Sequence, residues 1–456
     1  MMRKIPLFLS GAALGAIALV AIDEVRFSIS ANAAASDTYR RLTLFGEVFD
    51  KIRSDYVDKP DEAKLIEAAI NGMVQSLDPH SSFLDQKSNL EMQQQTRGEF
   101  GGLGIEVQME EGLVRVVTPF DESPAAKAGI QANDLITHIN EEQVQGLTLS
   151  QAVDKMKGPR GTEVKLKLLR NKRDVVDVTI VRDIIRPPVV RAQKEGDDIG
   201  YLRLGSFNEQ TNEGLRKEIT RLTNEIGADK LKGFILDLRN NPGGLLDQAV
   251  FVADSFLEGG EIVSTRGKTS DQTSRALAKP GDITNGKKVV VLINGGSASA
   301  SEIVAGALQD QERATIVGTR SFGKGSVQSI FQMRGNSALK LTTQLYYTPS
   351  GRSIQGKGIT PDFIVQQDVP EAERARYEIK GESAMRGHIK VNEEEQGGSS
   401  GYVPTDRSKD TQILWATKYL RGEVSRENPG EGVTVTPKQA KPEARANMGK
   451  PAEKKN

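Results

Sequence analysis

The chain has 456 residues, enough for two or three domains, with 61 basic residues, 61 acidic residues and no cysteine. The charge balance argues against a nucleic-acid partner, and the lack of cysteine excludes disulfides, thiolate nucleophiles and cysteine zinc sites. The chain contains three histidines and no His-Glu-x-x-His motif. The composition therefore predicts no metal site and no cofactor.

The first 33 residues have the pattern of an export signal. Arg3 and Lys4 precede an apolar stretch over residues 5–22, and Ala31-Asn-Ala33 offers small residues at a cleavage site. The apolar stretch is also nearly long enough to span a membrane, so an uncleaved anchor that associates the chain with the membrane is the open alternative. In both cases we expect export, to the periplasm or the outer face of the inner membrane.

Residues 36–92 are predicted to be a helical region. Apolar residues recur at spacings of three and four over residues 41–52 and 62–77, and Asp78-Pro79 is a helix stop. These helices could pair with a second copy, which leaves a homodimer open. His80 follows the stop, and we expect it to pack within the loop rather than to act as a catalytic base.

A small β-rich module is predicted over residues 93–183. A glycine-rich loop, residues 98–104, runs into an alternating strand, and later strands flank two short helices. The pattern resembles a PDZ domain, whose peptide ligand adds as a strand while loop N–H groups bind its carboxylate. The resemblance implies that the peptide site includes Gly102, Leu103, Gly104 and Ile105. The alternative is a small β domain in which the glycines only make turns.

Residues 189–366, after the Arg186-Pro-Pro188 linker, are predicted to be an α/β core. Buried strands alternate with amphipathic helices as far as residue 317, which favours a mostly parallel sheet with helices packed on it. A hairpin is expected over residues 329–343. Beyond, residues 367–456 are expected to contain one helix, residues 411–420, and a disordered tail from Arg426.

Residues 294–328 carry the strongest chemical signal. A strand leads through a glycine turn into a helix that begins among Ser297, Ser299 and Ser301, and unpaired N–H groups at a helix start favour an anion. A serine hydroxyl is a poor nucleophile until a base takes its proton. Lys324, between two glycines, can be that base if desolvation lowers its pKa. The turn Gly243-Gly244 and the helix start at Ala300 would supply N–H donors for the oxyanion.

Two other interpretations of this stretch stay open on the residues alone. Ser299 and Glu302 form a capping box, so the serines could merely start a helix. Residues 318–324 fit G-x-x-x-x-G-K, with Asp237 as an acidic metal partner, but Gly325 stands where a P-loop needs serine or threonine and a strand pattern follows.

Three motifs together resemble the carboxy-terminal processing (tail-specific) proteases: residues 296–302, 321–328 and 237–244. The resemblance implies an α/β fold with a crotonase/ClpP-like core, an inserted PDZ domain and an N-terminal helical arm. It implies a serine endopeptidase that recognises protein substrates by their C-terminal tails through the PDZ domain, and a switch in which tail binding aligns the site. The residues that it assigns are Ser299 as nucleophile, Lys324 as base, Gln328 as its support, and Ala300 and Gly244 as oxyanion donors. The alternative is an inactive PDZ-bearing periplasmic adaptor.

Overall fold

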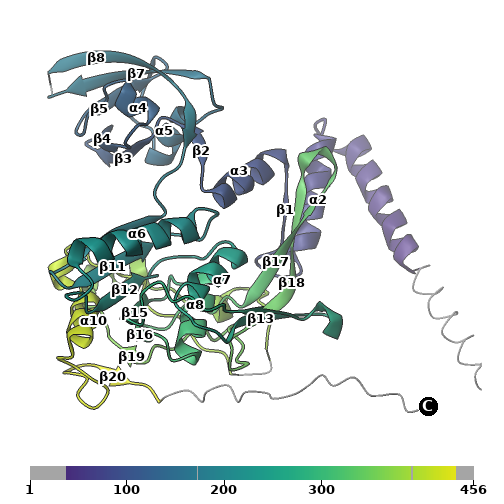
Figure 1. Ribbon diagram of the computed structural model, residues 1–456. Helices are drawn as coiled ribbons and strands as arrows, with labels where there is room; N and C mark the ends of the chain where they lie inside the picture. The colour runs from purple at the N-terminus through teal and green to yellow at the C-terminus, as the bar shows by residue number, and fades with distance from the viewer. Residues whose placement is uncertain (1–36, 172, 392–393, 438–456) are drawn as a thin grey trace, which may run out of the picture. The chain divides into compact units, whose positions relative to one another are not determined.

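The structure is a computed structural model that describes residues 37–171, 173–391 and 394–437 (Figure 1). The predicted export signal or anchor, residues 1–33, lies outside the described residues. None of the described helices is long and apolar enough to cross a membrane.

The chain divides into two compact units at Met73 and Val74. In the first unit residues 37–55 are helical, and α2 (Glu62–Gln75) begins after a short loop. Both helices fall where the apolar spacing predicts them. On the helix at 37–55, Leu42, Phe45 and Val48 recur at a spacing of three and are exposed, as expected of an amphipathic helix whose apolar face is not covered within its own unit.

The second unit is built around a seven-stranded sheet whose five central strands are parallel. The strands alternate with helices, so the mostly parallel α/β core predicted from the sequence is confirmed. Only the two edge strands run antiparallel to their neighbours. In order across the sheet the strands are β10 (Val190–Glu195), β11 (Ile199–Leu204), β12 (Gly233–Asp237), β15 (Lys288–Ile293), β16 (Thr315–Gly318), β19 (Phe363–Ile364) and β20 (Thr434–Val435).

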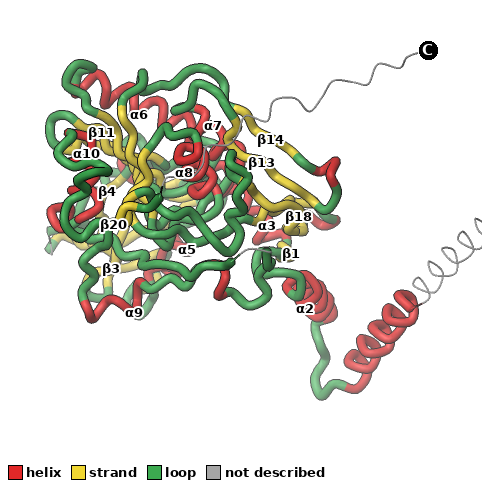
Figure 2. Tube along the Cα trace, turned by 90° about the horizontal axis from the view of Figure 1, so that it is seen from below, coloured by secondary structure: helices red, strands yellow, loops and turns green. Residues whose placement is uncertain are grey.

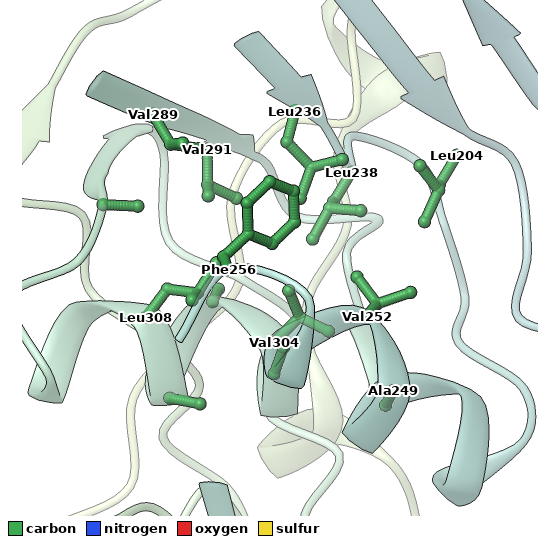
Figure 3. Close-up of a cluster of buried hydrophobic side chains, with 14 of the residues drawn as sticks. Leu204, Leu236, Leu238, Ala249, Val252, Phe256, Val289, Val291, Val304 and Leu308 are labelled. Carbon is green, nitrogen blue, oxygen red and sulfur yellow. The ribbon is translucent and has the colours of Figure 1, made fainter. Parts of the chain in front are cut away.

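Helices cover both faces of this sheet because its central strands are apolar on both sides. On one face Leu236 and Val291 pack around Phe256 with side chains of two helices (Figure 3), and a third helix contributes to the same apolar cluster. On the other face the alternate residues Ile235 and Val290 pack against a fourth helix. The three helices of the first face are α6 (Thr211–Ile226), α7 (Leu246–Asp254) and α8 (Ala300–Asp310), and the fourth is α10 (Thr411–Arg421).

A second, antiparallel sheet contains the predicted hairpin, in which two long strands pair over most of their length. The neighbouring strands of this sheet run side by side (Figure 2). The hairpin is longer than predicted, because its first strand begins at Ser326, within the motif of residues 321–328. The strands are β1 (Ser82–Leu84), β13 (Glu261–Gly267), β14 (Ser274–Leu277), β17 (Ser326–Gln332) and β18 (Ala338–Tyr347).

The β-rich module is a sheet of six strands with its own apolar core and two short helices. Before it lies α3 (Gln86–Arg97), and a two-stranded pair, β2 (Phe100–Gly102) with β9 (Asp183–Ile185), joins the ends of the module. Its other elements are β3 (Ile105–Glu110), β4 (Leu113–Pro119), α4 (Pro124–Lys127), β5 (Leu135–Ile139), β6 (Glu142–Gln143), α5 (Leu149–Met156), β7 (Glu163–Arg170) and β8 (Asp174–Val181).

The C-terminal region is more ordered than the sequence predicts. Besides α10 and the short α9 (Arg374–Tyr377), it contributes β20, which pairs with β19 at the edge of the main sheet. The prediction of a disordered tail from Arg426 is therefore wrong for residues 426–437, because backbone pairing and the Thr436 hydroxyl hold this segment against Pro361 and Asp362. Residues 438–456 lie outside the described residues.

Candidate active site

Three adjacent parallel strands carry the segments that the sequence singled out. β12, β15 and β16 lie side by side, with Ile293 opposite Gly318. The segments that follow these strands hold, in that order, the glycine turn with Gly244, the turn with Ser299 and the loop with Lys324. Because the carboxyl ends of parallel strands meet at one edge of a sheet, the fold brings the three motifs together.

The structure distinguishes Ser299 from the two serines beside it. The Ser297 hydroxyl donates to the Leu238 carbonyl at 2.8 Å, and the Ser301 hydroxyl donates to the Asn241 carbonyl at 2.9 Å. Both hydroxyl groups therefore stabilise the segment that follows β12. Ser299 sits at the start of α8 with φ +56° and ψ −112°, a conformation that costs a non-glycine residue about 1–3 kcal/mol and recurs at catalytic sites.

The Glu302 carboxylate joins the turn with Ser299 to the loop with Lys324. It is fully buried and accepts hydrogen bonds from the Ser299 N–H (2.7 Å), the Ser321 hydroxyl (2.6 Å), the Gly323 N–H (2.7 Å) and the Lys324 N–H (3.0 Å). Burial raises the pKa of Glu302 to about 7, against the opposite effect of these four donors. The glutamate of the capping box therefore caps the helix and also fixes the lysine loop.

Lys324 lies in a desolvated position with its ammonium directed at Gln328. Nζ donates to Gln328 Oε1 at 2.7 Å, and the Gln328 amide donates to the Ser326 and Thr342 hydroxyls, which sets its orientation. Burial, with a further contribution from the positive charge of Lys340, lowers the pKa of Lys324 to about 8. No hydrogen bond joins Lys324 to Ser299 among the described residues.

A second set of buried polar groups supports the lysine loop from residues far away in the chain. The Gly325 N–H donates to Gln355 Oε1 at 2.9 Å, and the Gln355 amide donates to Glu382 at 3.0 Å. Glu382 is fully buried and also contacts His80 Nε2 at 2.9 Å. His80 thus contacts a distant segment of the chain, whereas the sequence led us to expect packing within its own loop. Glu382 was missed because the sequence after residue 370 carries no motif.

The two predicted oxyanion donors differ from their neighbours in their hydrogen bonding. The Gly243 N–H donates to Asn241 Oδ1 at 2.9 Å. The N–H groups of Gly244 and Ala300, by contrast, have no protein acceptor among the described residues. Gly244 has φ +145°, and a Cβ there would lie 2.0 Å from the Phe207 carbonyl oxygen, so the position requires glycine.

The arrangement does not support the nucleotide-binding alternative. Asp237 is fully buried, accepts from Arg239 and from the Tyr201 hydroxyl at 2.7 Å each, and is thus not free to hold a metal. Lys324 is followed by the strand β17 and not by a helix whose start could bind phosphate. Across the described ranges, no cluster of three or more histidines and carboxylates could hold a metal ion.

Ser299, Lys324, Gln328 and Gly244 line one cavity of about 1670 Å³. Tyr346 also lines it, and burial raises the pKa of Tyr346 to about 12. The phenol is therefore neutral near pH 7 and can only offer or accept a proton in a hydrogen bond. Ala300 directly follows Ser299 as the first residue of α8 and is not among the residues that line the cavity.

The four predicted peptide-binding residues lie at one edge of the β-rich module. Gly102 ends β2, and Ile105 begins β3, an edge strand that has a neighbouring strand on one side only among the residues that the structure describes. The carbonyls of Leu103 and Gly104 accept from the chain at residues 120–125, whereas their N–H groups have no partner within the part of the chain that the structure describes. Loop N–H groups beside an edge strand are what a peptide carboxylate and backbone need.

Three family models match the chain: the PDZ domain over residues 101–180, Peptidase family S41 over residues 198–365, and the N-terminal domain of the activating protease CtpB over residues 19–88. Together with the α/β core and the turn that carries Ser299, these matches define a serine-type peptidase with a PDZ domain.

Known relatives specify the family further. The chain is 52% identical over 428 residues to a carboxy-terminal-processing protease of Bartonella bacilliformis, covering 93% of this chain and 97% of the relative. It is 35% identical to the carboxy-terminal processing protease CtpA of Bacillus subtilis, covering 77% and 74%. A solved photosystem II D1 C-terminal processing protease is 29% identical, with a TM-score of 0.41, and the match covers 72% of this chain and 92% of that one. The chain belongs to the carboxy-terminal processing proteases.

Proposed function

We propose that this protein is a serine endopeptidase of the cell envelope that cleaves with a Ser299–Lys324 dyad after its PDZ domain binds a C-terminal tail. The observation that carries the dyad is the pairing, in one cavity, of a strained serine with a buried lysine whose pKa is near 8. A lysine with that pKa is neutral in part of the population near pH 7 and can accept a proton.

In the first half of the reaction Lys324 Nζ takes the proton of the Ser299 hydroxyl, and Oγ attacks the carbonyl carbon of the scissile peptide bond. The negative charge that develops on the carbonyl oxygen is held by the N–H groups of Gly244 and Ala300. The Lys324 ammonium then gives its proton to the leaving amine, and an acyl-Ser299 ester remains.

In the second half a water loses its proton to Lys324 and attacks the ester carbonyl. Collapse of this intermediate releases the new C-terminal carboxylate, and the proton returns from Lys324 to Ser299. Gln328 acts as a positioning residue throughout, because its amide orientation is set by Ser326 and Thr342 and its oxygen holds the lysine.

Recognition of the substrate is proposed to begin at the PDZ domain. A tail would add as a strand beside β3 and place its carboxylate on the N–H groups of Leu103 and Gly104, which have no protein partner among the described residues. Lys324 Nζ donates to Gln328, and no hydrogen bond joins it to Ser299 among the described residues. We therefore propose that a change in the lysine loop on tail binding completes the dyad.

The envelope location rests on the sequence of residues 1–33, in which a basic pair precedes an apolar stretch. Fractionation of cells that express the full chain tests it. Recovery in the periplasmic or membrane fraction is expected, and recovery with cytosolic markers would contradict it.

The catalytic proposal is tested by incubating the full chain with a protein that carries an apolar, unstructured C-terminal tail. We expect cleavage by the wild type and none by Ser299→Ala or Lys324→Ala. Ser408→Ala and Lys409→Ala are matched controls, since both residues are exposed and lie outside the cavity. A fluorophosphonate probe followed by peptide mapping should label Ser299.

Cleavage that survives Ser299→Ala with intact folding would overturn the dyad. The adaptor alternative predicts that the wild type binds the tail peptide but neither cleaves it nor reacts with the probe. Probe labelling without cleavage would instead indicate that the substrate tail, and not the mechanism, was chosen wrongly.

A further inference from the structure

A second lysine lines the candidate cavity from the β17–β18 hairpin. Lys340 lies on β18, where its backbone is paired with Ile330 of β17. Two residues further along, Thr342 pairs with Gln328 and accepts its amide hydrogen bond. Because side chains two apart on a strand share a face, Lys340 projects on the same side of the hairpin as the support of Lys324. Lys340 lines the same cavity as Ser299 and Lys324.

The Lys340 ammonium is not neutralised by the protein. Within the described ranges it forms neither an ion pair nor a hydrogen bond, and it is only partly exposed. The carboxylates that face Lys324 already have donors: Glu302 from α8 has four, Glu382 binds His80 and Gln355, and Asp78 accepts from the segment before β1 and from Thr342.

We propose that Lys340 is a positioning residue whose fixed positive charge keeps Lys324 unprotonated, so that Lys324 can act as the general base. The proposal rests on the proposed Ser299–Lys324 dyad and adds a role for a residue outside the catalytic motifs. Two ammonium groups that share a partly desolvated cavity repel each other, and the more buried group loses its proton first. Burial disfavours the charged form of Lys324, so we expect Lys324 to be the group of this pair that loses its proton.

The test is the pH dependence of kcat/KM for the tail substrate. The acidic limb is the part of the profile in which kcat/KM rises with pH. In Lys340→Gln we expect this limb to move to higher pH, and each pH unit of displacement should lower kcat/KM at pH 7 about tenfold. At high pH kcat/KM should recover towards the wild-type value. Lys340→Arg keeps the charge and should keep the limb near its wild-type position.

The chain contains no cysteine, which permits a chemical rescue at this position alone. Lys340→Cys should behave as Lys340→Gln, and alkylation with 2-bromoethylamine, which restores an amine at the same place, should return the limb towards the wild type. Alkylation with iodoacetamide adds a neutral group and should not. Arg334→Gln removes a charge from the exposed tip of the same hairpin and should leave the limb unchanged.

If Lys340→Gln folds and its acidic limb does not move, the proposal is overturned. It is also overturned if Lys340→Cys loses activity equally at all pH values and both alkylating reagents restore that activity equally. Either result would assign Lys340 a steric role. These outcomes are distinct from failure of the proposed dyad. If the dyad is wrong, Lys324→Ala should cleave the substrate as fast as the wild type does.

Discussion

At the scale of single residues, the candidate site holds its two reacting groups in states that cost free energy. Ser299 adopts a positive φ, and Lys324 is buried so far that its charged form is disfavoured. Such states persist only where surrounding contacts enforce them. Here the contacts converge on Glu302, whose carboxylate binds the backbone on both sides of the dyad.

The depressed pKa of Lys324 predicts how cleavage depends on pH. Only neutral lysine can accept the serine proton, so kcat/KM should rise with pH and level off above about pH 8, the pKa that burial gives Lys324. Below that value the activity should fall about tenfold per pH unit. Initial rates with a fluorogenic tail peptide from pH 6 to 10 check this, and a profile that is flat across this range contradicts a lysine base.

Replacing Glu302 with glutamine should damage the site more than its small size change suggests. All four partners of the carboxylate are donors, and an amide NH₂ group would face some of them as a second donor. We expect the free energy of unfolding to fall by about 1–3 kcal/mol and kcat to drop by at least about a hundredfold, since a misplaced base loses its alignment.

Chemical denaturation and cleavage assays measure these two effects of Glu302→Gln. Glu423→Gln, at an exposed position beyond α10, serves as the matched control and should behave as the wild type. Unchanged cleavage in Glu302→Gln would show that the carboxylate does not position the dyad.

At the scale of elements, side-chain hydrogen bonds link the glycine turn with Gly244 to the C-terminal helix α10. Arg239 precedes the turn, is buried, and binds Asp237 from β12 as well as Asp410 at 2.9 Å. Asp410 is also the N-cap of α10, where its side chain accepts from the Ile413 N–H. Helix α10 is therefore part of the support of the catalytic edge, although it lies outside the matched peptidase segment.

Asp410→Ala should leave the buried Arg239 with one carboxylate partner and remove the cap of α10. Loss of one partner of a buried ion pair costs about 3–5 kcal/mol, so we expect a large fall in the melting temperature and in cleavage. Differential scanning calorimetry with Asp406→Ala, an exposed neighbour, provides the comparison. Equal melting temperatures for the two variants would contradict this support.

At the scale of the whole molecule, recognition and cleavage are assigned to separate modules. The PDZ module has its own apolar core, so its peptide site can be altered without touching the catalytic residues. Gly104 is the best position for a substitution that alters the peptide site. It has φ +76°, and an added Cβ would lie 2.4 Å from the Ser123 Cβ. Any side chain there must displace the loop that we propose binds the carboxylate.

Gly104→Ala should weaken tail binding by at least about tenfold, or about 1.4 kcal/mol. The measurement is fluorescence anisotropy with a labelled tail peptide on the full chain carrying Ser299→Ala, which prevents cleavage. Gly112→Ala is the matched control, because Gly112 also has positive φ but open space around its Cβ. An amidated peptide should bind weakly to all variants, and equal affinities for Gly104→Ala and Gly112→Ala would contradict the proposed loop.

Much of the fold followed from local patterns, and the errors have a physical cause. Periodicity located the strands and helices of the core, and motif residues identified Ser299, Lys324 and Gln328, which the fold places in one cavity. The order of residues 426–437 was missed because two-residue strands such as β20 carry no periodic signal and exist only through pairing with β19.

Taken alone, the sequence determined the family, the order of the modules and the residues proposed for the reaction, because those depend on residue type and on spacing within one motif. The tertiary structure decided what surrounds them: the four donors of Glu302, the contact of His80 with Glu382 across 302 positions, and the place of Lys340 in the cavity that Lys324 lines. Contacts of this kind depend on which surfaces pack together, and a spacing pattern within one segment does not encode the partner that a distant segment will bring.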